Sequence, residues 1–216
     1  MEKHIWLERW EKGQTGFHND EVNPLFTQHF KELELPLASR IFVPLCGKTL
    51  DIGWLLSRGF CVVGVELSEM AVKELFAELG EEPYIMQDGE HKHYHAENID
   101  IFVGDFFTLT AEMLGNIDAV YDRAAIVALP QEMRKAYTKH MLTLTKGLPQ
   151  LMTTVVYDQS LMNNSPFSVD REELQAHYGE HYEIRQLDVI QVEGGLKQVK
   201  DVTEYVWLLS DASDES

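Results

Sequence analysis

The chain of 216 residues has few basic side chains, few cysteines and no long apolar run. Its 18 lysines and arginines are outnumbered by 36 aspartates and glutamates, so the formal net charge is -18 at pH 7. Nucleic acids and anionic membranes are bound through basic surfaces. The composition therefore argues against a nucleic-acid partner and against a membrane partner.

The two cysteines, Cys46 and Cys61, form neither a CxxC motif nor a disulfide framework, which is typical of a reducing compartment. The longest apolar runs, such as residues 61–65, have the length of a strand, whereas a membrane-spanning helix needs about 20 residues. The first residues, MEKHIWLERWEKG, lack the continuous apolar stretch of a signal peptide. We expect a cytoplasmic monomer with a single domain over residues 1–216.

Short apolar runs alternate with amphipathic segments along most of the chain, which predicts a mostly parallel sheet with helices on both faces. Two longer alternating runs near the end predict an antiparallel hairpin. Residues 82–97 interrupt the alternation and are interpreted as an insertion. The seven predicted strands are residues 40–45, 61–65, 99–103, 117–121, 151–157, 182–192 and 199–209. The predicted helices include residues 24–33 and 50–57, a helix that begins at the cap Ser68 and ends at Gly80, and a short helix that begins at the capping box of Asp170 and Glu173.

Sheets of this kind bind ligands at the carboxyl ends of their strands. Gly47 follows the first strand and would let the backbone approach a ligand, but a strand-to-helix turn that needs glycine fits equally well. Neither GxGxxG nor GxxxxGK[ST] is present there, so pyrophosphate binding has little support. Glu66 ends the next strand, where a carboxylate can accept hydrogen bonds from both ribose hydroxyls.

Two further loops carry candidate residues. Asp105 could accept a hydrogen bond from an adenine amino group and Phe106 could cover the ring, although a turn with a core phenylalanine explains both residues as well. Asp122 and Arg123 follow the fourth strand, either as ligand contacts or as a structural ion pair. A ribose-binding acid without a pyrophosphate loop indicates a nucleoside cofactor without phosphates, and S-adenosylmethionine is the natural candidate.

Four segments resemble the thiopurine S-methyltransferase family: WLERWEKGQTGFH at 6–18, RIFVPLCGKTLDIGWLLSRG at 40–59, VVGVELS at 62–68 and YDRAAIVAL at 121–129. The resemblance runs in order over residues 6–209. It implies a Rossmann-like class I methyltransferase with a seven-stranded sheet. The implied reaction moves the methyl group of S-adenosylmethionine to the sulfur of aromatic or heterocyclic thiols and leaves S-adenosylhomocysteine.

The resemblance also implies roles for individual residues on the cofactor side. Glu66 is expected to hold the ribose, and the loop that contains Leu45 to contact the cofactor through its backbone. The full set of expected cofactor-binding residues is Trp10, Leu45, Gly47, Glu66, Asp105, Phe106 and Arg123.

On the substrate side, Arg123 is expected beside the methionine end and the substrate thiol, as the catalytic residue and a substrate-binding residue. Phe17 is the second expected substrate-binding residue, in an N-terminal helical lid over residues 1–35. Where family members often carry a GPPF-type segment, this chain reads NSPF at 164–167. That departure lies where a substrate-side loop is expected, so the acceptor stays open.

Alternatives remain for the acceptor and for the function class. Selenium or tellurium species are also soft nucleophiles, while an NAD-dependent oxidoreductase is disfavoured because GxGxxG is absent. A binding protein without activity is disfavoured because the expected site residues are all present. His91, His93 and His95 would share one face of an exposed hairpin in the insertion. With no further ligand in view, we expect no metal site there.

Overall fold

A computed structural model describes residues 3–14 and 20–211 of the chain. The chain divides into two compact units, Met1–Val120 and Tyr121–Ser216. The division falls inside strand β6 (Ala119–Asp122), so the single domain expected from the chain length stays a prediction. Among the described residues, no helix is long and apolar enough to cross a membrane.

The first unit is built on parallel strands. β1 (Arg40–Pro44) pairs in parallel with β2 (Cys61–Glu66) and with the first residues of β6, and β2 pairs in parallel with β5 (Ile99–Val103). The strand order in this unit is β3-β4-β5-β2-β1-β6. Nearly every residue of β1 and β2 is buried, as expected for parallel strands covered on both faces.

The segment 82–97 differs from the prediction. It forms a hairpin of β3 (Tyr84–Asp88) and β4 (His91–Ala96), and β4 pairs antiparallel with β5. The hairpin therefore adds two strands to the sheet beyond the seven expected ones. His91 is buried, so the expectation of an exposed hairpin is wrong at this residue, although most of β3 is exposed.

Local capping signals explain where the helices of the first unit begin. The Ser68 hydroxyl accepts a hydrogen bond from the Ala71 N–H at the start of α4, and Gly80 ends that helix with a φ of 73°. The stretch predicted as one helix at 24–33 is a short α-helix followed by a 3-10 turn. The helical elements are α1 (Lys3–Glu11), α2 (Pro24–His29), η1 (Phe30–Leu33), α3 (Leu50–Ser57), α4 (Glu69–Leu79), η2 (Phe106–Thr108) and α5 (Ala111–Leu114).

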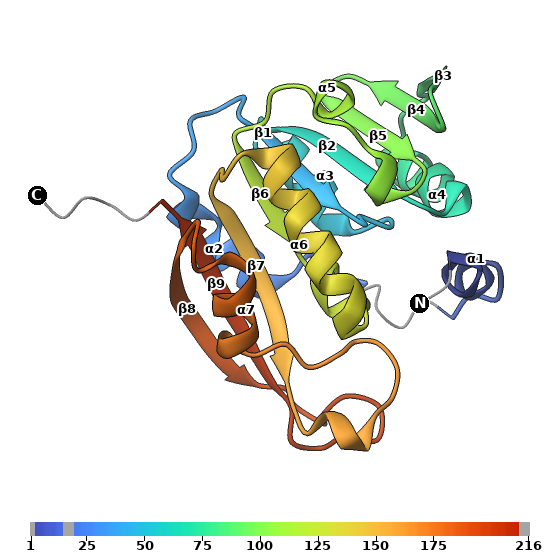
Figure 1. Ribbon diagram of the computed structural model, residues 1–216. Helices are drawn as coiled ribbons and strands as arrows, with labels where there is room; N and C mark the ends of the chain where they lie inside the picture. Colours follow the sequence, from blue (N-terminus) through green and yellow to red (C-terminus); the bar gives the residue numbers. More distant parts are fainter. Residues whose placement is uncertain (1–2, 15–19, 212–216) are drawn as a thin grey trace, which may run out of the picture. The chain divides into compact units, whose positions relative to one another are not determined.

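In the second unit, three antiparallel strands lie side by side in the order β7-β9-β8 (Figure 1). This confirms the predicted C-terminal hairpin, with a register shift between Gln186 and Asp188. Its strands are β7 (Gln150–Val156), β8 (Glu183–Gln191) and β9 (Thr203–Ser210). Its helical elements are η3 (Ile126–Ala128), α6 (Gln131–Thr145), η4 (Gln159–Leu161) and α7 (Arg171–Tyr178).

Candidate cofactor site at the strand ends

Glu66 joins the ends of two neighbouring strands. Its carboxylate is buried at the end of β2, where one oxygen accepts a hydrogen bond from the Gly47 N–H at 2.8 Å and the other accepts one from the Ser68 N–H at 2.8 Å. Burial raises the pKa of the Glu66 carboxyl, and these backbone donors oppose that rise. Since each carboxylate oxygen has two lone pairs, both can accept a further hydrogen bond.

The loop between β1 and α3 has an unusual backbone. Leu45 has a φ of 48° and Gly47 a φ of 53°, both in the left-handed region. For a residue other than glycine this conformation costs about 1–3 kcal/mol, and such strain concentrates at ligand sites. Leu45 therefore adds backbone strain to the loop after β1, where the sequence already predicts a contact with the cofactor.

Cys46 lies between these two residues and is buried. Its N–H donates to the Val65 carbonyl at 3.1 Å, which ties the loop to the end of β2. Burial, together with the nearby Glu66 carboxylate, raises the pKa of the Cys46 thiol well above its ordinary value. A thiol of this kind stays protonated at neutral pH and serves as a small packing group rather than as a nucleophile.

Trp10 packs against the same loop, and its expected contact with the cofactor stays a prediction. The indole is buried, and a Cβ atom added at Gly47 would lie 3.2 Å from Trp10 Cζ2. The absence of a side chain at Gly47 thus leaves room for the ring. Helix α1 carries Trp10 to this position and contacts α4, while Ile5 and Leu7 on the same helix stay exposed.

Asp105 and Phe106 follow β5 in a tightly packed turn. The Asp105 carboxylate accepts a hydrogen bond from the Phe107 N–H at 3.1 Å, and the Phe106 ring is buried. A Cβ atom at Gly104 would lie 2.3 Å from the His91 ring, so only glycine fits there. The turn with a core phenylalanine, left open by the sequence, accounts for these contacts; the adenine roles of Asp105 and Phe106 stay predictions.

Arg123 belongs to the second unit and directly follows β6. It is half-buried and lies close enough to Glu204 to lower the pKa of that carboxyl, which burial raises on balance. The next residue, Ala124, also has a left-handed backbone, with a φ of 60°. The role of Arg123 toward cofactor and thiol stays a prediction.

Asp122 fixes the loop that carries Arg123. Its buried carboxylate accepts hydrogen bonds from the Tyr137 hydroxyl at 2.7 Å and the Ile126 N–H at 3.1 Å. Burial raises its pKa to about 6. The sequence analysis considered Asp122 only as half of a charged pair with Arg123. The apolar residues on either side of that pair would have suggested that Asp122 is a buried acid.

The remaining substrate-side predictions are only partly covered by the structure. Phe17 lies outside the described residues, as do other parts of the proposed lid over residues 1–35. The NSPF segment is held by hydrogen bonds within the second unit. The Phe167 N–H donates to the Val127 carbonyl at 2.6 Å, and the Tyr157 hydroxyl donates to the Pro166 carbonyl at 2.7 Å.

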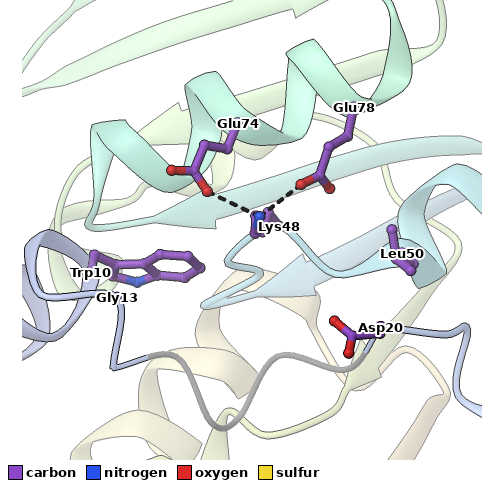
Figure 2. A pocket seen from close by; sticks show the side chains of 7 residues that line it. All are labelled: Trp10, Gly13, Asp20, Lys48, Leu50, Glu74 and Glu78. Atoms are coloured by element: carbon purple, nitrogen blue, oxygen red, sulfur yellow. Dashed lines mark hydrogen bonds and ion pairs between the residues drawn. The ribbon is translucent and has the colours of Figure 1, made fainter.

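A cleft of about 470 Å³ opens beside Trp10 (Figure 2). Inside it, the Lys48 ammonium pairs with Glu74 at 3.0 Å and with Glu78 at 2.7 Å. Sequence reasoning missed these three residues, although Lys48 ends the PLCGK segment and the two glutamates lie one helical turn apart on α4. The residues that line the cleft are Trp10, Gly13, Asp20, Lys48, Leu50, Glu74 and Glu78. It therefore adjoins the strand-end site without including Glu66.

Comparisons with known proteins agree over nearly the whole chain. Residues 1–211 match the family model described as thiopurine S-methyltransferase. A thiopurine S-methyltransferase of Xanthobacter autotrophicus is 48% identical over 213 residues, which cover 98% of this chain and 100% of that protein.

The fold is similar to solved structures of low sequence identity. A SAM-dependent methyltransferase from Anabaena variabilis gives a TM-score of 0.70 at 15% identity, over 97% of this chain and 94% of that one. A 1,6-didemethyltoxoflavin-N1-methyltransferase from Burkholderia thailandensis, with S-adenosylhomocysteine bound, gives 0.64 at 14% identity, over 97% and 87%. These likenesses confirm the predicted Rossmann-like α/β fold.

Proposed function

The chain belongs to the thiopurine S-methyltransferase family, and on that basis we propose that it methylates the sulfur of aromatic or heterocyclic thiols. It is a methyltransferase that uses S-adenosylmethionine, and the transfer leaves S-adenosylhomocysteine. The proposed acceptor is a small-molecule thiol. We further propose that the enzyme works as a monomer in the cytoplasm.

The observation that best supports this function is the arrangement around Glu66. Its carboxylate is fixed by the N–H groups of Gly47 and Ser68, so its free lone pairs have defined directions. Two neighbouring ribose hydroxyls could donate to them, one to each oxygen. The strained loop at Leu45 and the indole of Trp10 would then bound the space for the rest of the cofactor.

Bound S-adenosylmethionine would supply a methyl group that is already activated on a sulfonium sulfur. The contribution of this chain is then orientation of the two reactants, which can lower a barrier by roughly 7–11 kcal/mol in favourable cases. Trp10 and Phe17 would exclude water, since attack by a thiolate on a cation is faster in a dry site. Arg123 would stabilise the bound thiolate or orient a water molecule that takes its proton.

The test is methyl transfer from radiolabelled S-adenosylmethionine to a panel of heteroaryl thiols. Each thiol is paired with its oxygen analogue, and selenite-derived species and a reaction without acceptor are run alongside. Label on the thiols and not on the oxygen analogues is the expected result. Label on the selenium species alone would replace the proposed acceptor, and cofactor binding without transfer to any acceptor would show that the assigned substrate class is wrong.

A further inference from the structure

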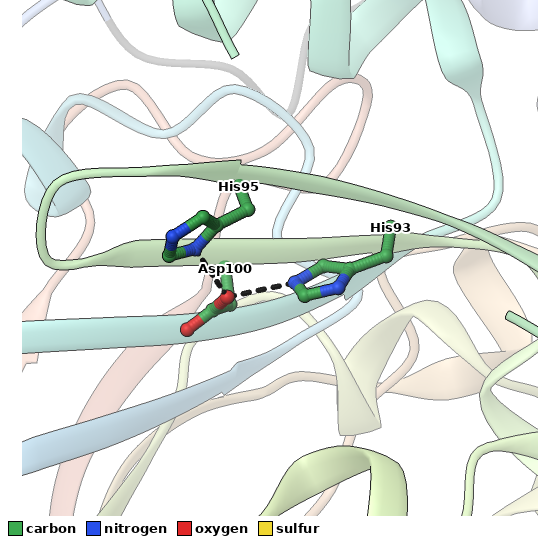
Figure 3. Close-up of side chains that lie close together, drawn as sticks. All are labelled: His93, His95 and Asp100. Atoms are coloured by element: carbon green, nitrogen blue, oxygen red, sulfur yellow. Dashed lines mark hydrogen bonds and ion pairs between the residues drawn. The ribbon is translucent and has the colours of Figure 1, made fainter. Parts of the chain in front are cut away.

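Three potential metal ligands meet on the β4–β5 pair, away from the strand-end loops (Figure 3). One oxygen of the Asp100 carboxylate lies 2.7 Å from His93 Nε2 and 2.9 Å from His95 Nδ1. The ligand atoms of the three side chains all lie within 4.8 Å of one another. Within the described parts of the chain, this is the one such group of three or more histidine, cysteine or acidic side chains.

The strand register explains why these side chains converge. His93 and His95 are two residues apart on β4, so they project from the same face of the sheet. Asp100 is the cross-strand partner of His95 on β5, and Phe102 is the partner of His93. The His93 ring stacks on Phe102, with ring centres 4.5 Å apart and planes at 16°, which limits its rotation.

We propose that His93, His95 and Asp100 form a binding site for a divalent transition-metal ion such as Zn²⁺. Two imidazoles and one carboxylate match the ligand types of zinc sites that keep a position open. Bonds of about 2.0–2.1 Å put tetrahedral ligand atoms about 3.3 Å apart. To admit the ion, the Asp100 oxygen would move outward from between the imidazoles, and the two ring nitrogens, which lie within 4.8 Å of each other, would draw closer together. A neutral imidazole would bind through the nitrogen that faces Asp100.

Arg40 prepares the carboxylate for this role. Its guanidinium donates to the other Asp100 oxygen at 2.8 Å, which fixes the carboxylate and leaves the oxygen between the histidines for a metal. The positive charge of Arg40 also weakens the attraction of Asp100 for any cation. Selectivity would therefore rest on the two imidazole nitrogens, which favours Zn²⁺, Cu²⁺ or Ni²⁺ over Mg²⁺ or Ca²⁺.

The position of the site indicates what a bound ion would do. Asp100 lies near the start of β5, and Asp105 follows its end, about 16 Å further along an extended chain. His95 is the most solvent-exposed ligand, with 54% of its side chain accessible, so the open position would face water. The ion would link β4 to β5, the second and third strands from the edge of the sheet, apart from the methyl-transfer chemistry.

The experiment is calorimetric titration of metal-free protein, made without a histidine tag, with ZnCl₂. The wild type should bind one Zn²⁺, and His95→Ala should bind it at least tenfold more weakly. His181→Ala is the matched control, because His181 is an exposed histidine outside the cluster, and it should bind like the wild type. The absence of zinc binding by the wild type, or equal binding by His95→Ala, would overturn the proposal.

Asp100→Asn gives a second variant that keeps the side-chain shape. Zinc at about 100 times its Kd should raise the Tm of the wild type by about 5–10 °C. The shift should be much smaller for Asp100→Asn, once circular dichroism shows that the variant is folded. An equal shift in both proteins would exclude Asp100 as a ligand, and X-ray absorption with nitrogen and oxygen ligands would support the site.

Discussion

The substitution Glu66→Gln removes the charge that we expect to hold the ribose while it preserves the size of the side chain. In the wild type both carboxylate oxygens accept a backbone hydrogen bond, from Gly47 and from Ser68. An amide has a single oxygen, so its NH₂ group must face one of these N–H donors. One backbone hydrogen bond is therefore lost, and one proposed ribose hydroxyl loses its acceptor.

The expected loss of cofactor affinity follows from the hydrogen bond to the ribose that the variant cannot form. A hydrogen bond to a charged group contributes about 1.5–3 kcal/mol. The variant should therefore bind S-adenosylmethionine about 10- to 150-fold more weakly, at about 1.4 kcal/mol for each factor of ten. S-adenosylhomocysteine should lose the same factor, because the two molecules share the ribose.

The assay is isothermal titration calorimetry with both nucleosides, on protein whose folding is checked by a urea melt. Glu82→Gln is the control, since Glu82 is an exposed glutamate in the same unit and should bind like the wild type. An unchanged Kd for Glu66→Gln would refute the ribose role of Glu66. An equal loss in the control would show that net charge, and not the local contact, sets the affinity.

Three further predictions concern the loops at the strand ends. Gly47→Ala should weaken cofactor binding, because its Cβ would lie 3.2 Å from Trp10 and its backbone would be strained by about 1–2 kcal/mol. Gly80→Ala is the control, since it has similar backbone strain but open space around its Cβ, and it should lose stability without losing cofactor affinity. Equal cofactor Kd values for the two variants in calorimetry would contradict this prediction. The pKa of Asp122 is raised by burial to about 6 from its ordinary 3.8, so its contribution to stability is present below about pH 4 and is lost as pH rises through 6. Between pH 4 and 7, the free energy of unfolding measured in urea melts should decrease by about 3 kcal/mol less in Asp122→Asn than in the wild type. An identical dependence on pH in both proteins would count against a raised pKa of Asp122. Arg123→Ala should lower kcat at saturating thiol by a larger factor than it weakens cofactor binding; undiminished turnover would remove Arg123 from the mechanism.

Local signals made much of the fold predictable from the sequence. Helix α3 covers the predicted residues 50–57, and α4 begins and ends at the predicted caps Ser68 and Gly80. The Asp170 side chain caps α7 through the Glu173 N–H, as the sequence pattern indicates. Capping depends on residues within one turn of each other, so a single sequence contains the whole signal.

Pairings between distant segments were not predictable in the same way. Nothing local to residues 82–97 shows that β4 pairs with β5, so the contribution of Asp100 to the histidine cluster became visible only in the structure. The left-handed backbone of Leu45 is equally hidden, because leucine rarely adopts it. For the candidate site, Trp10, Gly47 and Glu66 were predicted and do lie together in one unit.

The most direct test of sulfur methylation is the identity of the product. S-adenosylmethionine labelled with ¹³C in its methyl group is incubated with the enzyme and a heteroaryl thiol that also has ring nitrogens. NMR of the product then shows which atom carries the label. We predict a methyl group on sulfur, whereas a methyl group on a ring nitrogen, or no labelled product while the cofactor binds, would contradict sulfur methylation.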